Sequence, residues 1–294
     1  MIKSFSMKYL AIYKKIVKPL ILLVVLSNAV VLASSVTGTH QGYVGVEESS
    51  AVVEELKQPE FHPSLTDFYG DGADTVPICK VKVDDDRKNY ISLTFDSAYI
   101  NTETYKILDL LDKYDAKATF FMTGGFITCN VSQVREIIKR GHEIGNHTGS
   151  HPNLNNVDVA WATKEILNCH SALKEKFGID MCLFRFPYGA HNETNLTLLK
   201  NLGYYPIQWI IDSADWKNTN VDAILNVFKS KRYYKPGNII LFHNGAKYTV
   251  EALKTILEDI KEEGLKCVRV SDMIYKEDFF INHNGVQIKN TDIY

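Results

Sequence analysis

Short apolar runs alternate with amphipathic stretches through most of the chain. The runs are rich in branched and aromatic residues, as strands covered on both faces are. They span residues 91–95, 118–122, 142–145, 183–186, 205–211, 238–242 and 266–270. Helical spacing of apolar side chains follows over residues 104–114, 132–140, 157–177, 192–202, 221–232 and 249–263, and glycine, the usual helix stop, follows most of these stretches. About seven such alternations predict a parallel sheet and a closed or nearly closed α/β barrel.

Polar residues lie at or near the ends of several of these runs. Asp96 follows the first run, Asp212 and His243 follow two later runs, and Arg185 lies inside another. In α/β barrels the chemistry takes place at the carboxyl ends of the strands. We therefore expect these side chains to converge on one rim and to form a site.

The pentapeptide His147-Thr148-Gly149-Ser150-His151 follows the weak run 142–145. Two histidines four residues apart lie on one face of a helical turn, where they can bind one metal ion together. The alternative is that both are ordinary surface histidines. The neighbouring polar clusters favour a metal site.

The ends of the chain differ from the middle. Residues 1–18 contain five lysines and no acid, and residues 19–33 are apolar apart from Ser27 and Asn28. This pattern predicts that residues 1–36 are a signal peptide, or an anchor formed by residues 19–36, and that the protein is exported to the cell surface or beyond. Membrane contact is expected only through this segment. We further expect a stalk or wrapping segment over 37–86, a catalytic domain over 87–276 and a hairpin tail over 277–294, where Asn284-Gly285 is a turn signal.

The charge and the cysteine spacing argue against several classes of protein. The formal net charge is −2, which argues against a binder of nucleic-acid phosphates. The five cysteines are widely spaced and form no Cys-x-x-Cys pair, so neither a disulfide framework nor a zinc knuckle is indicated.

Five short motifs resemble those of the polysaccharide deacetylases of carbohydrate esterase family four. They are Thr94-Phe95-Asp96-Ser97, His147 to His151, Arg185-Phe186-Pro187-Tyr188-Gly189, Asp212-Ser213-Ala214-Asp215-Trp216 and Leu241-Phe242-His243, in the order of the family. The resemblance covers roughly residues 88–275 and implies a distorted (β/α)7 barrel. It also implies a divalent metal, zinc or another ion such as cobalt, on His147 and His151. The implied substrate is peptidoglycan or another N-acetylated polysaccharide.

Amide hydrolysis needs a base, an acid and a charge sink, and the motif residues can supply them. We assign Asp96 as the general base and His243 as the general acid for the departing amine. Arg185 is expected to pair with Asp96 and keep it ionised. Asp212 is expected to hydrogen-bond His243 and raise its pKa.

The remaining motif residues are expected to bind substrate or support the site. The backbone N–H of Tyr188 would stabilise the oxyanion, and Leu241 and Trp216 would surround the acetyl methyl group. Asp215 is a supporting residue, with a structural ion pair to Arg185 as the alternative.

One residue departs from the family pattern. Ser97 stands where the family usually has a metal-binding aspartate, so metal affinity is expected to be weak. Some family members that act on muramic acid residues also lack this aspartate, so N-acetylglucosamine and N-acetylmuramic acid both stay open. Two alternatives remain: an O-acetyl esterase acting on xylan or an exopolysaccharide, and a non-catalytic module that binds cell-wall glycan.

Overall fold

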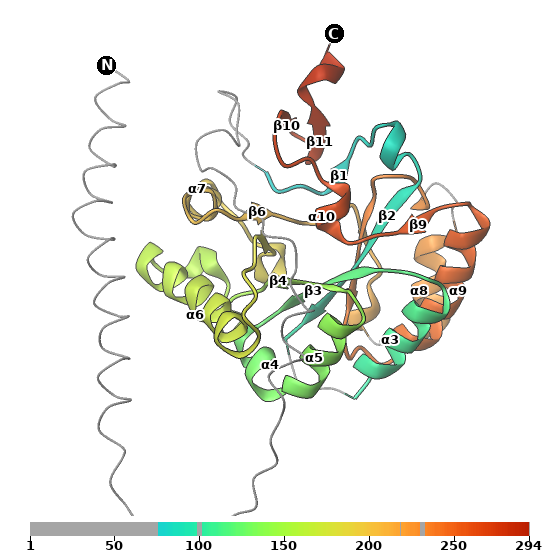
Figure 1. Ribbon diagram of the computed structural model, residues 1–294, viewed down its shortest axis with the longest axis horizontal. Helices are drawn as coiled ribbons and strands as arrows, with labels where there is room; N and C mark the ends of the chain where they lie inside the picture. Colours follow the sequence, from blue (N-terminus) through green and yellow to red (C-terminus); the bar gives the residue numbers. More distant parts are fainter. Residues whose placement is uncertain (1–75, 99–101, 218, 230–232, 294) are drawn as a thin grey trace, which may run out of the picture. The chain divides into compact units, whose positions relative to one another are not determined.

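The computed structural model describes residues 76–98, 102–217, 219–229 and 233–293 (Figure 1). The predicted signal peptide or anchor and most of the predicted stalk lie outside these residues. No helix in the described part is long and apolar enough to cross a membrane.

A parallel sheet forms the centre of the described chain. Its order is β6-β5-β4-β3-β2-β8-β7, and β9 pairs with the start of β2. This confirms the predicted parallel α/β barrel architecture, with β6 and β7 as the two ends of the sheet. The strands are β2 (Tyr90–Ser97), β3 (Ala118–Met122), β4 (Glu143–Asn146), β5 (Leu183–Phe184), β6 (Tyr205–Pro206), β7 (Ile211–Asp212), β8 (Ile239–His243) and β9 (Lys266–Cys267).

The composition of residues 205–211 predicted one strand, but the structure divides this run into two. Its first part is β6, which pairs with β5, and its last part is β7, which pairs with β8. The residues between them connect the two ends of the sheet, and Ile210 is exposed. The barrel is therefore distorted where this run divides.

Helices pack against the outer side of the sheet in an arc from α7 to α8 (Figure 1). Neighbouring pairs along this arc are α8–α9, α9–α3, α3–α5, α5–α4, α4–α6 and α6–α7. The short helix α4 was not predicted, because it begins with two glycines; the hydroxyl of Thr123 caps it by accepting a hydrogen bond from the N–H of Phe126. The helices are α3 (Thr104–Lys113), α4 (Gly124–Cys129), α5 (Val131–Lys139), α6 (Val159–Phe177), α7 (Glu193–Asn201), α8 (Val221–Phe228), α9 (Thr249–Glu262) and α10 (Val270–Met273).

A stack of phenylalanines fixes the register of the three central strands. Phe95 on β2 stacks on Phe120 of β3 at 5.0 Å and on Phe242 of β8 at 5.5 Å between ring centroids, and all three are fully buried. The next residues along β2 and β8 are Asp96 and His243, which are register partners. The apolar core thus places two polar side chains at the same level of the rim.

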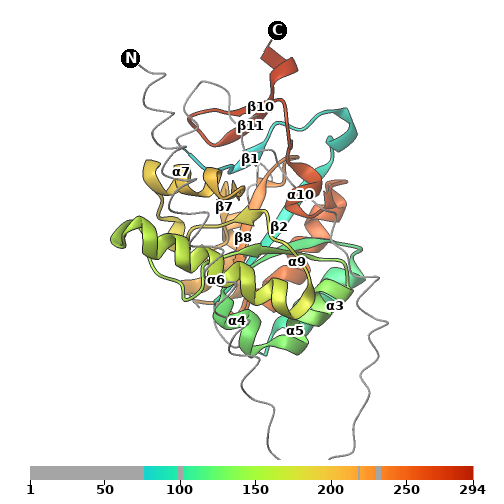
Figure 2. The ribbon, with the colours of Figure 1, turned by 60° about the vertical axis from the view of Figure 1, so that its left-hand side comes forward.

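A second, three-stranded sheet joins residues from both sides of the barrel sequence. It has the order β1-β11-β10, formed by β1 (Lys80–Val81), β10 (Phe279–Ile281) and β11 (Val286–Lys289) (Figure 2). Residues 76–83, which we placed in the stalk, therefore belong to the folded part, and Ile78 is fully buried. Gly237 makes the close approach possible: its φ is +80°, and a Cβ there would lie 1.8 Å from the carbonyl oxygen of Val81.

Candidate active site

A cavity of about 640 Å³ opens at the carboxyl ends of the central strands. It brings together side chains from β2, β8 and the loops after β4, β5 and β7. Among its lining residues are Asp96, His147, His151, Tyr188, Asp212, Trp216, Leu241 and His243. The predicted convergence on one rim is present.

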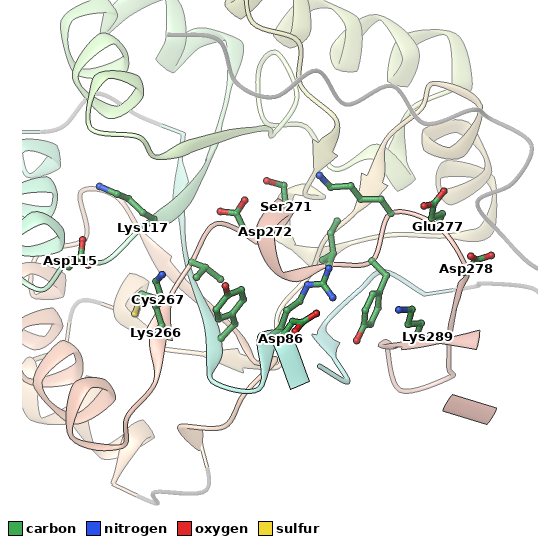
Figure 3. Close-up of a pocket in the computed structure, with 16 residues that line it drawn as sticks. Asp86, Asp115, Lys117, Lys266, Cys267, Ser271, Asp272, Glu277, Asp278 and Lys289 are labelled. Carbon is green, nitrogen blue, oxygen red and sulfur yellow. The ribbon is translucent and has the colours of Figure 1, made fainter. Parts of the chain in front are cut away.

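A larger hollow of about 900 Å³ lies elsewhere, near the start of β2 and the C-terminal sheet (Figure 3). Its lining contains none of the predicted site residues. Acidic and basic side chains occur there in equal numbers, five of each, so the hollow favours neither sign of charge. The cavity at the carboxyl ends is the better candidate because it holds the groups that can carry chemistry.

Asp96 is held by a buried arginine. Arg185 Nη1 donates to Asp96 Oδ1 at 2.8 Å and to the hydroxyl of Thr94 at 2.8 Å, and its guanidinium lies 4.1 Å from the ring centroid of Phe121. Burial acts to raise the pKa of Asp96, but the positive charge of Arg185, with smaller contributions from His147 and His243, lowers it below its ordinary value. Asp96 is therefore poised as an ionised base.

The two predicted metal ligands face each other. Their Nε2 atoms are 3.2 Å apart, close to the ~3.3 Å expected between two nitrogens of one tetrahedral zinc with Zn–N of about 2.0–2.1 Å. The Nδ1–H of His147 donates to the carbonyl of Arg185 at 2.8 Å, which leaves the lone pair on Nε2 toward the cavity. Burial lowers the pKa of His147, and it lowers the pKa of His151 to about 4, so both rings are neutral, as metal ligands must be.

The pentapeptide from His147 to His151 is not a helical turn, which corrects our expectation. It is an irregular loop in which Thr148 and His151 have φ of +70° and +65°. Contacts from distant helices override the local helical spacing. The rings meet because of this loop conformation rather than because they share one face of a helix.

Ser97 does not complete a three-residue protein ligand set. It is fully buried, and its hydroxyl accepts a hydrogen bond from Asn244 Nδ2 at 3.1 Å. Among the residues that the structure describes, no group of three or more histidine, cysteine or acidic side chains is arranged to hold a metal. The donor set fits a divalent ion through two imidazoles, with the remaining positions left to water or substrate.

The structure corrects the partner of His243. Asp215, not Asp212, accepts from His243 Nδ1 at 2.8 Å, and it also accepts from the His243 backbone N–H at 2.8 Å and from the Thr249 hydroxyl at 2.6 Å. Asp212 instead accepts from the backbone N–H of Ala214 at 2.8 Å, in the turn that carries Asp215 beneath His243. The proposed ion pair between Arg185 and Asp215 is wrong, because each is paired with another residue.

His243 is electrostatically suited to the acid role. Burial acts to lower its pKa, but the hydrogen bond to Asp215 and the negative charges of Asp96, Asp215 and Asp212 raise it above the ordinary value. The rim thus carries a base whose pKa is lowered and an acid whose pKa is raised, on adjacent strands.

Aromatic and apolar groups line the cavity around these polar side chains. Tyr188 is 68% exposed and its ring lies edge-on to His151, with centroids 4.7 Å apart. Trp216 is 52% exposed, and Leu241 is buried in the cavity lining. Trp209, which no motif indicated, also lines the cavity, and its ring centroid lies 5.4 Å from the guanidinium of Arg185. It lies at the break between β6 and β7, where the sequence has no periodic signal.

Comparisons with known proteins show which family the chain resembles. A sequence profile described as polysaccharide deacetylase matches residues 83–207. A peptidoglycan-N-acetylglucosamine deacetylase of Bacillus cereus is 37% identical over 190 residues, which cover 63% of this chain and 87% of the relative. A peptidoglycan-N-acetylmuramic acid deacetylase of Bacillus subtilis is 30% identical over 201 residues, 65% of this chain and 74% of the relative.

A solved structure shares the fold. It is a CE4 family pseudoenzyme from Bacillus anthracis with a TM-score of 0.63 and 26% identity, covering 68% of this chain and 69% of that one. A mutant of that pseudoenzyme is described as having restored enzymatic activity. From the identity to the Bacillus cereus relative over most of that relative's length, the matching profile and the shared fold, it follows that the chain belongs to the polysaccharide deacetylase family, the carbohydrate esterase family 4.

Proposed function

We propose that the protein is an exported, metal-dependent hydrolase that removes N-acetyl groups from amino sugars of peptidoglycan. The substrate is N-acetylglucosamine or N-acetylmuramic acid within the glycan, and the products are acetate and a free amine. The observation that carries the proposal is the pairing of Asp96 with Arg185 and of His243 with Asp215 on one rim. A module that only binds glycan has no need for a base and an acid with oppositely shifted pKa values.

The residues divide the reaction between them. The Asp96 carboxylate takes a proton from the attacking water, whose oxygen forms a bond to the acetyl carbon. His243 donates the proton on Nε2 to the amide nitrogen as the C–N bond breaks, while Asp215 holds the Nδ1–H and fixes the ring. A divalent ion on His147 and His151 would act as a Lewis acid for the carbonyl oxygen and lower the pKa of a bound water.

The residues that line the cavity are suited to bind an N-acetyl group on a sugar. Leu241 offers an apolar contact for the acetyl methyl group, and the exposed rings of Tyr188 and Trp216 can stack on sugar faces. The backbone N–H of Tyr188 stays our prediction for the oxyanion donor.

The test is acetate release from purified peptidoglycan by the full chain. We expect release that a chelator stops and that added zinc or cobalt restores, and the mass of the products identifies the sugar. His243→Ala is expected to slow turnover by orders of magnitude with glycan affinity retained. Release from acetylated xylan but not from peptidoglycan would support the esterase alternative instead.

A second candidate is a non-catalytic module that binds cell-wall glycan. The hydrogen bond from Asn244 to Ser97 favours it, because the usual carboxylate ligand is missing and its place is filled. So does the similarity to a pseudoenzyme. Glycan binding by the folded wild-type protein, without acetate release at any metal concentration, would select this candidate.

A further inference from the structure

The loop that carries both histidines has two residues in an unfavourable backbone conformation. Thr148 and His151 both have positive φ, a region that residues with a Cβ rarely adopt. Such a conformation persists only when surrounding contacts determine it. The rings are therefore placed by whatever holds this loop.

Two helices hold the loop between His147 and His151. At the start of α4, the N–H groups of Gly124 and Gly125 donate to the carbonyls of Thr148 and Gly149 at 3.0 and 3.1 Å. From α6, the carboxylate of Glu165 accepts from the backbone N–H of Ser150 through Oε2 at 2.7 Å and from the Ser150 hydroxyl through Oε1 at 3.0 Å.

The Glu165 carboxylate is buried although the residue it binds is on the surface. Glu165 is only 6% exposed, whereas Ser150 is exposed. Gly149 lets the carboxylate come close, because a Cβ there would lie 3.1 Å from Glu165 Oε2. Charge-assisted hydrogen bonds from both Ser150 donors offset part of the cost of burying this charge.

We propose that Glu165 is a positioning residue that clamps Ser150 and thereby fixes the separation and aim of the His147 and His151 rings. The inference deepens the proposed metal-dependent function and rests on it. Glu165 does not touch the metal position; it acts through the one residue that lies between Gly149 and His151.

The first test measures, without any metal, how strongly Glu165 protects the Ser150 amide. Amide hydrogen exchange is measured on the full chain as wild type, Glu165→Ala, Glu165→Gln and Glu175→Ala. The last is the matched control, since Glu175 is exposed on the same helix α6. We expect Ser150 exchange to rise at least about tenfold in Glu165→Ala, as for an exposed amide that loses its acceptor, and to stay unchanged in the control.

Glu165→Gln separates the clamp from a general packing role. Its amide oxygen can still accept from the Ser150 N–H, and its amide N–H can donate to the Ser150 hydroxyl. We expect this variant to recover most of the protection of Ser150. Unchanged Ser150 exchange in Glu165→Ala, or equal loss in Glu165→Gln and Glu165→Ala, would overturn the clamp.

The second test measures zinc affinity by calorimetry and the visible spectrum of the cobalt-loaded protein. We expect Glu165→Ala to weaken zinc binding about 10–100-fold and to alter the cobalt spectrum at saturation, whereas Glu165→Gln and Glu175→Ala stay near wild type. Wild-type zinc affinity and an unchanged cobalt spectrum in Glu165→Ala would overturn the inference.

If the wild type binds no zinc, the metal dependence of the proposed function fails, and Ser150 exchange alone decides the clamp. If Glu165→Ala does not fold, Ser150→Ala replaces it: this change removes only the hydroxyl contact and is expected to weaken zinc binding several-fold, and unchanged affinity would overturn the clamp.

Discussion

Asp215→Asn is the substitution that tests the acid side of the site most directly. Asp215 is fully buried and its carboxylate accepts the Nδ1–H of His243 at 2.8 Å, which stabilises the protonated ring whose second proton, on Nε2, is the transferable one. An asparagine of the same shape removes the negative charge. Its amide N–H can also face Nδ1, which would then accept instead of donate, so the doubly protonated imidazolium that gives up its Nε2 proton would lose its stabilising partner.

The size of the effect follows from the lost hydrogen bond. A hydrogen bond to a charged group contributes about 1.5–3 kcal/mol, and each 1.36 kcal/mol corresponds to about tenfold in rate. The side chain of His243 is 32% exposed, so solvent screening favours the lower part of this range. We expect kcat/KM for acetate release to fall about 10–50-fold in Asp215→Asn, with folding checked by circular dichroism.

The pH profile gives a second readout of the same substitution. As the proposed general acid, His243 would act in its protonated form, so activity is expected to fall as the pH rises through its pKa. Burial acts to lower that pKa, while Asp215, together with the charges of Asp96 and Asp212, raises it. Removing the Asp215 charge lowers the pKa, and the alkaline limb of kcat/KM should therefore move to lower pH.

Asp212→Asn is the matched control, because it removes a carboxylate from the same turn without touching the His243 ring. Its bond to the N–H of Ala214 can be kept by the asparagine oxygen. We expect a loss of at most about threefold, the effect of one charge without a direct contact. A larger loss in Asp212→Asn than in Asp215→Asn, or an alkaline limb that stays in place in Asp215→Asn, would refute the assignment of Asp215 to His243.

Three other substitutions test the metal site and the fold. Ser97→Asp should tighten zinc binding by more than the roughly 10–100-fold typical of an outer-shell partner, because it adds a charged ligand; equal affinities by calorimetry would contradict this. Phe120→Ala should lower the free energy of unfolding in denaturant by about 3–5 kcal/mol, because it empties a fully buried stack, and a loss under about 1 kcal/mol would show that the stack is not packed as described. Gly237→Ala should lower the unfolding temperature well below that of Gly264→Ala. Both glycines have positive φ, which costs about 1–2 kcal/mol for alanine. Only at Gly237 would the added Cβ also meet the Val81 carbonyl. Similar unfolding temperatures would contradict this close approach.

The parallel fold could be predicted because its strands are apolar on both faces and its helices are amphipathic. Both signals are local in sequence, and glycine marks the helix ends; Gly178, with φ of +71°, ends α6 as expected. The break between β6 and β7 could not be predicted from residues 205–211, because which neighbour a strand pairs with depends on the rest of the sheet. The short helix α4 was not predicted either, because its two glycines disfavour a helix. The Thr123 hydroxyl stabilises it by capping its first turn.

In the site, too, the positions of residues on strands could be predicted from the sequence, whereas the conformations of the loops could not. Asp96 and His243 lie on the rim as expected, because each is at or next to the end of a buried strand and the two are register partners. The helical turn at His147 and the assignment of Asp212 to His243 were wrong because both lie in loops, where positive-φ residues and contacts from distant elements decide which side chain faces the cavity. Glu165, 15 residues from Ser150 in the chain, has no motif signal of its own but binds the loop between the two histidines. The strands therefore place Asp96 and His243 at the same level of the rim, whereas contacts from α4 and α6 hold the loop that lies between His147 and His151.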